Sequence, residues 1–282
     1  SGAFSLASMI NGLLTIAMGW LTDKFGPRMV MTICGLFLGL GFILMSQINA
    51  VSHLYLFYGI LVGAGMSGSF VPLMSTVSRW FIKKRSSMAG IVAAGTGVGA
   101  LIGPPVASRL IPIYGWRLSY AILGGIVLLV VILFAQLIKR DPAQVGQIAY
   151  GENQLGREQL NLKAEGLSLK EAVYSSPFWV FFATGFCYGY CVFAFMVHIT
   201  PHAIELGISA ISAANLIATV GGLGIIGKVL MGRVGDIIGN KRIMIIGYIL
   251  ISATLIWLVL TEKAWMLFSI AGTFGFGYGG IT

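Results

Sequence analysis

Long apolar runs separated by short charged breaks are the feature that most constrains what this chain can fold into. Each run has about 20 residues, the length that an α-helix needs to cross the hydrocarbon core of a bilayer. There are nine of them: 3–22, 29–48, 54–78, 88–112, 116–138, 177–200, 209–231, 243–261 and 264–282. Backbone amides inside lipid have no water to bond, so each run must be helical. The sequence therefore predicts an all-α fold, a polytopic transmembrane helical bundle.

Composition supports a multi-pass protein of the cell inner or plasma membrane. Hydrophobic residues make up 57% of the chain and charged residues only 10%, whereas a soluble domain has about a quarter charged residues. We find no nucleophile–base pair and no metal-ligand set at membrane depth, so an intramembrane enzyme is not expected. The three cysteines all lie in apolar runs, which excludes a zinc or disulfide framework. The sequence predicts no cofactor and no metal.

The positive charges are unevenly distributed between the two sides of the membrane. When the loops are assigned alternately to the two sides, 14 of the 18 Lys and Arg residues fall on one side and three on the other, with Lys228 inside a span. Basic loops stay in the cytoplasm. The net charge of +9 thus reflects topology and does not indicate nucleic-acid binding.

The segment 139–176 is the only long polar stretch, and we interpret it as a cytoplasmic linker. It separates an N-terminal bundle of five spans (1–138) from an incomplete C-terminal bundle of four spans (177–282). Within the linker, Ser168 and Glu171 have the spacing of a capping box at the start of a short surface helix.

One loop motif occurs twice, after the first span and after the seventh. Both copies read G-x-x-x-D-x-x-G and are followed by basic residues: Gly19, Asp23, Gly26 and Arg28 in the first, and Gly232, Asp236, Gly239 and Arg242 in the second. The motif predicts a tight turn between two helices, with a glycine for close contact and an aspartate to cap or pair. Two copies at corresponding places indicate a parallel duplication, which is typical of transporters built from two similar halves.

This pair of loops resembles the signature of the major facilitator superfamily, in which it joins helices two and three and helices eight and nine. Three further stretches resemble its monocarboxylate transporter and oxalate/formate antiporter branches: Arg79–Gly90, Tyr114–Arg117 and His198–Ser209. The resemblance implies two pseudo-repeated halves. It also implies that the nine spans are helices two to ten of twelve, so we expect the chain to be truncated at both ends and not to transport alone.

Lys228 is the strongest candidate for a substrate-binding residue. It lies about one turn before the second motif loop, and an ionisable group inside a span is a functional hypothesis by default. Gly221 and Gly224 share its helix face and leave room beside the ammonium. The resemblance implies an arginine here that binds the substrate carboxylate. The lysine lacks the bidentate fork of arginine, and it could instead extend its amine to the membrane interface.

Four other polar residues within spans are candidates for lining a central cavity. Asn11, Tyr188 and Tyr278 could equally bond a neighbouring helix. His198 could act as a proton-sensitive gate or be an interfacial polar group. His198, His202 and Glu205 superficially suit a metal, but Pro201 is expected to interrupt the helix and to leave Glu205 in the outer loop.

Gly95, Gly99 and Gly103 recur at four-residue spacing in the fourth span. No lysine and serine or threonine follow them as in a phosphate-binding loop. A stripe of small residues at this spacing instead predicts close helix packing.

The function implied is a secondary active transporter that moves a small organic anion by alternating access. The expected partners are that anion, the lipid bilayer and possible coupling protons, with symport of a monocarboxylate preferred. Two alternatives stay open, an anion antiporter of the oxalate/formate type and a membrane sensor that does not transport.

Overall fold

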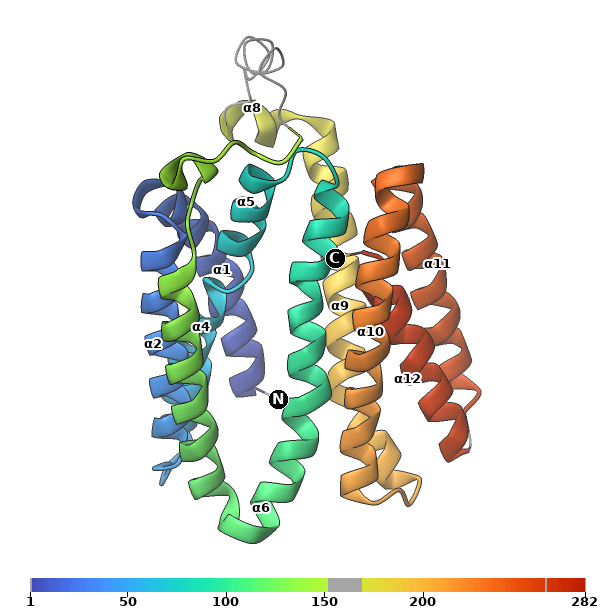
Figure 1. Cartoon of the computed structure of the whole chain (residues 1–282). Helices are drawn as coiled ribbons and strands as arrows, with labels where there is room; N and C mark the ends of the chain where they lie inside the picture. Colours follow the sequence, from blue (N-terminus) through green and yellow to red (C-terminus); the bar gives the residue numbers. More distant parts are fainter. Residues whose placement is uncertain (1, 152–168, 262, 282) are drawn as a thin grey trace. The chain divides into compact units, whose positions relative to one another are not determined.

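The computed structural model describes residues 2–151, 169–261 and 263–281. In this part of the chain all regular secondary structure is helical, and an isolated bridge joins Phe81 to Tyr150. The elements, drawn in Figure 1, are α1 (Gly2–Phe25), α2 (Pro27–Met45), α3 (Val51–Leu54), the π-helix η1 (Tyr55–Val62), α4 (Gly63–Ser67), α5 (Val71–Trp80), α6 (Arg85–Leu137), the 3₁₀ helix η2 (Pro142–Val145), α8 (Leu169–Tyr174), α9 (Ser176–Glu205), α10 (Ala210–Ile238), α11 (Asn240–Val259) and α12 (Ala264–Gly279). The predicted all-α fold is confirmed.

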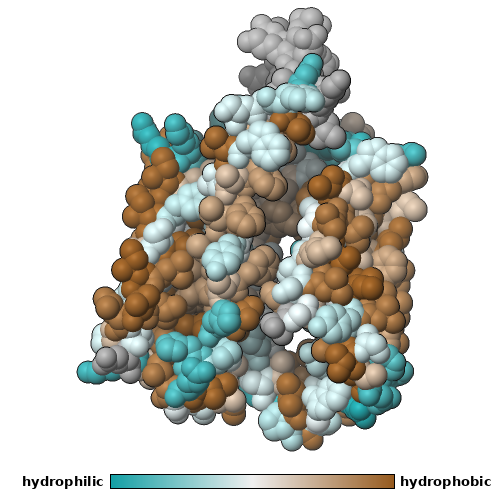
Figure 2. Space-filling model, turned by 180° about the vertical axis from the view of Figure 1, so that it is seen from behind, coloured by the Kyte–Doolittle hydropathy of each residue, from teal (hydrophilic) through white to brown (hydrophobic). Residues whose placement is uncertain are grey.

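Seven helices in the described part of the chain are long and apolar enough to cross a membrane. The difference from the nine predicted spans has two sources. The 53-residue α6 contains two of those spans and is broken between them at Gly115, whose φ of 74° is not helical. The last predicted span corresponds to α12, which has only 16 residues. Apolar side chains cover the flanks of the helices, and hydrophilic ones gather mostly near helix ends (Figure 2).

The chain divides into two compact units. Unit 1 comprises residues 1–82 and 107–150, and unit 2 comprises residues 83–106 and 151–282. The first half of α6 thus belongs to the same unit as α9–α12, because it packs against α10.

Unit 1 is built on α1 and α2, which both pack against η1 and α4. This packing requires a glycine at position 65 of α4, because a Cβ on Gly65 would lie 2.7 Å from the Cα of Leu38. At the break in α6, Arg117 donates hydrogen bonds to the carbonyl of Ile48 (2.9 Å) and to Asn49 Oδ1 (3.0 Å). These bonds hold the turn of α6 against the loop after α2.

Unit 2 has an apolar core contributed by all four of its long C-terminal helices. In the core, α10 packs on α12 and α9, and α11 packs on α12. Phe195 of α9 stacks on Phe274 of α12 with ring centroids 3.9 Å apart. The buried core residues are Val192, Phe195, Ile199, Ala203, Ala213, Leu216, Val220, Ile251, Leu267, Ile270, Ala271 and Phe274.

The interruption expected at Pro201 is wrong, because α9 continues through this proline to Glu205. Prolines are tolerated inside transmembrane helices, because neighbouring groups can satisfy the backbone carbonyl that the proline leaves free. Residues 152–168 of the predicted linker, which include the capping residue Ser168, lie outside the described residues, while α8 begins at the next residue, Leu169.

Candidate functional site

The ammonium group of Lys228 is buried inside unit 2. The residue is only 1% exposed, although it lies within three turns of the end of α10. Its Nζ donates hydrogen bonds to the carbonyl oxygen of Ala93 (3.1 Å) and to Thr96 Oγ1, both on α6. The side chain therefore does not extend to the membrane interface, and this alternative does not hold in the structure.

An aromatic wall completes the surroundings of the ammonium. Lys228 Nζ lies 4.5 Å from the ring centroid of Tyr278 on α12, which is cation–π distance. Tyr188 of α9 stacks on Tyr278 with centroids 6.2 Å apart and ring planes 7° apart. Three of the predicted substrate-site residues, from three different helices, thus lie together.

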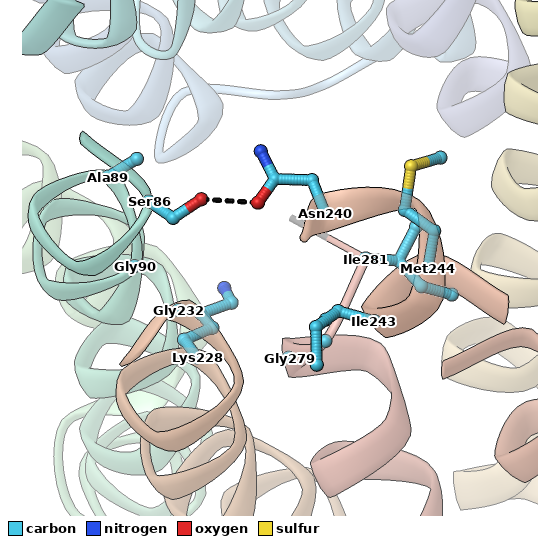
Figure 3. A pocket seen from close by; sticks show the side chains of 11 residues that line it. Ser86, Ala89, Gly90, Lys228, Gly232, Asn240, Ile243, Met244, Gly279 and Ile281 are labelled. Atoms are coloured by element: carbon cyan, nitrogen blue, oxygen red, sulfur yellow. Dashed lines mark hydrogen bonds between the residues drawn. The ribbon is translucent and has the colours of Figure 1, made fainter. Parts of the chain in front are cut away.

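A cavity of about 190 Å³ adjoins Lys228, between α6, α10, α11 and α12 (Figure 3). Ser86 donates a hydrogen bond to Asn240 Oδ1 (2.6 Å) at its edge. The lining residues are Ser86, Ala89, Gly90, Lys228, Gly232, Asn240, Ile243, Met244, Gly279, Gly280 and Ile281. This volume is below the ~300–1,000 Å³ of pockets for drug-sized ligands, so the cavity has room only for a small ligand.

Lys228 has no acidic partner in the described part of the chain. The salt bridges there join Arg79 to Asp23 and Asp141, and Arg140 to Asp141. Among the described residues, the groups that contact the Lys228 ammonium are a carbonyl, a hydroxyl and a ring face. Because a buried charge is costly without a partner of opposite sign, the arrangement favours a bound anion.

The other two predicted substrate-site residues lie elsewhere. His198 lines a second cavity, of about 550 Å³, together with His202, Glu205 and apolar residues of α9 and α11. The described residues contain no group of three side chains that could hold a metal. Asn11 belongs to unit 1, where Thr15 donates a hydrogen bond to its carbonyl oxygen (2.6 Å).

The two motif loops have the same backbone turn. Gly26 separates α1 from α2 with a φ of 86°, and Gly239 separates α10 from α11 with a φ of 91°. Each amide donates to the carbonyl four residues earlier, at 2.9 and 3.0 Å. L-residues with side chains rarely adopt this φ, so the second glycine of the motif is required by the turn in both copies.

The two motif aspartates have different partners. In unit 1, Asp23 forms a salt bridge of 2.9 Å with Arg79. In unit 2, Asp236 accepts hydrogen bonds from the backbone amides of Ser86 (3.1 Å) and Ser87 (3.0 Å) and from Ser87 Oγ. Asp236 thereby satisfies free amides in the first turn of α6 and places a negative charge at the positive end of its dipole.

The two copies of the motif also differ in the contacts of their arginine and of their first glycine. Arg28 Nε donates to Gln136 Oε1 at 2.7 Å, and the Arg242 amide donates to the Gly239 carbonyl at 3.2 Å. A Cβ at Gly232 would lie 2.8 Å from the Ser86 carbonyl, whereas one at Gly19 would make ordinary contact with Val71 at 3.6 Å. Close helix approach at the first glycine thus occurs in the second copy.

The glycines that bring α6 and α10 together are not the predicted stripe. A Cβ at Gly97 would lie 2.8 Å from the Gly221 carbonyl, and Gly90 also packs against the carbonyl of Lys228. An added Cβ at Gly95, Gly99 or Gly103 would meet no atom within 4 Å. Packing by this stripe therefore stays a prediction.

Thr96, Asn240 and Gly90 were not identified from the sequence. Thr96 and Gly90 lie within a run of small residues that gives no sign of which face meets α10. Gly90 and Gly97 are seven residues apart, as are Gly221 and Lys228. This spacing is the sequence signal that matches the observed contact between α6 and α10.

The family of the chain follows from comparison of its sequence with known proteins. The profile described as Major Facilitator Superfamily matches residues 1–282. Monocarboxylate transporter 13 of Bos taurus is 26% identical over 268 residues, which cover 93% of this chain and 59% of the relative. The oxalate:formate antiporter of Oxalobacter formigenes is 28% identical over 208 residues, covering 74% and 47%. The chain thus spans about half to three fifths of the length of these relatives.

The fold agrees with this result. A crystal structure of a double-tryptophan mutant of XylE matches with a TM-score of 0.72 at 15% sequence identity, covering 98% of this chain and 68% of that one. Members of the matched family are transporters rather than enzymes, and the membrane-spanning helices make this a multi-pass membrane protein. The chain belongs to the Major Facilitator Superfamily.

Proposed function

We propose that this protein is a secondary active transporter that moves a small organic anion by alternating access, with a monocarboxylate as substrate and protons as the coupling ion. The observation that carries the proposal is the buried ammonium of Lys228, which lacks a carboxylate partner among the described residues. A cation and a carboxylate about 4 Å apart attract by about 4 kcal/mol at an effective dielectric of 20. A substrate carboxylate would supply the missing charge.

The geometry around Lys228 supports a small substrate. The ammonium is a point charge with three donors, and two of its present bonds go to Ala93 and Thr96. A carboxylate can replace or join these bonds without the bidentate geometry that arginine would impose. We propose that Tyr278 and Tyr188 form one wall of the binding site, and that His198 and Asn11 line the pathway in other states of the cycle.

The motif loops are proposed to act as conformational switches. Asp236 joins the end of α10 to the start of α6 by hydrogen bonds alone, and Asp23 joins α1 to α5 by an exposed salt bridge. The exposed salt bridge is weak, and both contacts lie at helix ends, where they can be exchanged during a transport cycle. Gly26 and Gly239 allow a tight turn between the two helices of each pair, so the helices stay closely connected while the contacts change.

Antiport is a second candidate, because one relative is an oxalate:formate antiporter. Both candidates require an anion beside Lys228, and they differ in what drives uptake. A membrane sensor that does not transport is the third, and it would bind the anion without flux.

The test is uptake by the full-length protein in proteoliposomes. We expect saturable uptake of labelled pyruvate or lactate that an inward proton gradient stimulates when no anion is inside. Uptake that needs internal oxalate or formate, and ignores the proton gradient, would support antiport instead. Saturable binding of all these anions without any uptake would contradict transport and support the sensor.

A further inference from the structure

A groove runs between the start of α6 and the end of α10 in unit 2. It shares no lining residue with the cavity beside Lys228. Its volume is about 430 Å³. In the described part of the chain it is lined by Lys84, Ser87, Met88 and Ile91, on and just before α6, and by Val229, Arg233, Asp236 and Ile237 on α10. Apart from Asp236 and its hydrogen-bond partner Ser87, none of them has a role in the proposed transport function.

The lining changes from cationic to apolar along the groove. Lys84 precedes the first residue of α6, and Arg233 lies six residues before Gly239, where α10 ends. Met88 and Ile91 lie four and seven residues beyond Lys84, which is about 6 and 10 Å deeper at ~1.5 Å per residue. Val229 lies one turn deeper on α10 than Arg233. The groove therefore has two cations near the loop and an apolar trough toward the bilayer core.

The two cations are available for a ligand. Within residues 2–151, 169–261 and 263–281, neither Lys84 nor Arg233 takes part in a salt bridge. The one acidic lining residue, Asp236, has both oxygens engaged by Ser86 and Ser87 at the start of α6. Its charge is thus directed at the helix terminus, and the groove keeps a positive end.

The apolar part of the groove is exposed. Ile91 is 51% exposed, although it lies on a membrane-spanning helix. Exposed apolar residues at this depth contact lipid chains, so a molecule that fills the trough must itself be apolar. A soluble anion would satisfy the cations but would leave the trough unfilled.

We propose that this groove binds an anionic phospholipid, with its phosphate at Lys84 and Arg233 and an acyl chain along Met88, Ile91 and Val229. The basic loops place the groove in the cytoplasmic leaflet, where basic pockets between helices bind anionic headgroups. Arginine adds a fork that matches phosphate oxygens. Because the lining comes from both α6 and α10, the bound lipid holds these two helices together beside the Asp236 contacts.

The test is native mass spectrometry of the full-length protein, solubilised in detergent with equal amounts of dioleoylphosphatidylglycerol and dioleoylphosphatidylcholine. The unaltered protein is expected to retain phosphatidylglycerol preferentially. The double variant Lys84→Gln/Arg233→Gln should lose most of this preference, by about fivefold for each basic residue removed. The matched control Lys83→Gln/Lys241→Gln removes the same charge from the same side outside the groove and should keep the preference.

A second variant tests the trough without changing any charge. Ile91→Trp places a bulky side chain at an exposed position, and it should reduce retention of phosphatidylglycerol while both cations remain. Equal preference in the groove and control double variants would overturn the proposal. So would unchanged retention by Ile91→Trp, or equal competition by glycerol 3-phosphate, which has the headgroup charge but no acyl chain.

Discussion

Lys228 of α10 donates a hydrogen bond to the backbone carbonyl of Ala93 on α6, across 3.1 Å. This bond and the one to Thr96 tie the cation to a helix other than its own. A bound carboxylate would compete for the same donors. The residue proposed to bind the substrate therefore also contributes to the contact between α6 and α10, so substrate binding is expected to alter that contact.

Replacement of Lys228 tests the binding role directly. In the full-length protein, Lys228→Ala should reduce saturable anion uptake to background, because the substrate carboxylate would be left unpaired in a poorly hydrated site. Lys228→Arg should retain uptake with an altered preference among anions, since the charge persists and the geometry becomes forked. Uptake of labelled anion into proteoliposomes measures both.

The matched control for this experiment is Lys263→Ala, which removes a lysine at the exposed start of α12 and should transport normally. The binding role is ruled out if Lys228→Ala transports within about twofold of the unaltered protein, a difference of only ~0.4 kcal/mol.

Thr96 is expected to position Lys228. Thr96→Val keeps the shape of the side chain and removes its hydroxyl, and hydrogen bonds to charged groups contribute ~1.5–3 kcal/mol. We expect a lower melting temperature in detergent and a raised KM for the anion. Thr219→Val is the control, because the hydroxyl of Thr219 donates to the carbonyl of Asn215 on its own helix. Equal melting temperatures for the two variants would show that the Thr96 contact does not stabilise the protein.

The two motif aspartates should differ in their contribution to stability. Asp236→Ala leaves the amides of Ser86 and Ser87 without an acceptor, and the loss of a helix cap costs ~0.5–2 kcal/mol. Asp23→Ala removes a salt bridge whose carboxylate is 65% exposed, and exposed pairs contribute only ~0–1 kcal/mol. Thermal unfolding in detergent should show the larger decrease for Asp236→Ala. A larger decrease for Asp23→Ala would contradict the capping role.

Glycine substitutions on α6 and α10 should separate tight positions from open ones. Gly221→Ala would place a Cβ 2.7 Å from the carbonyl of Gly97, and overpacking of this kind costs ~1–3 kcal/mol. Gly95→Ala makes the same chemical change where no atom lies within 4 Å, and alanine is favoured over glycine in a helix by ~1 kcal/mol. We expect Gly221→Ala to melt lower and Gly95→Ala to melt no lower than the unaltered protein.

Much of the fold follows from local properties of the sequence. Apolar runs of membrane-spanning length must be helical in lipid whatever their neighbours are, so the helices could be predicted without any tertiary contact. The turns at Gly26 and Gly239 could also be predicted, because a positive φ favours glycine at a short connection. Lys228 stood out for the same kind of reason, since a charge inside a span is costly at any position along it.

The contacts between helices were decided only by the tertiary structure. The sequence contains many glycines in the first half of α6, and four-residue spacing selected Gly95, Gly99 and Gly103, whereas Gly90 and Gly97 pack against α10. The same holds for the aspartates, which occupy equivalent motif positions but bind Arg79 in one unit and the start of α6 in the other. A helix's own sequence determines that it forms, but its partner determines which face is buried. Lys228 bonds Ala93 and Thr96, which lie more than 130 residues away from it in the chain. No local sequence pattern could therefore reveal these partners.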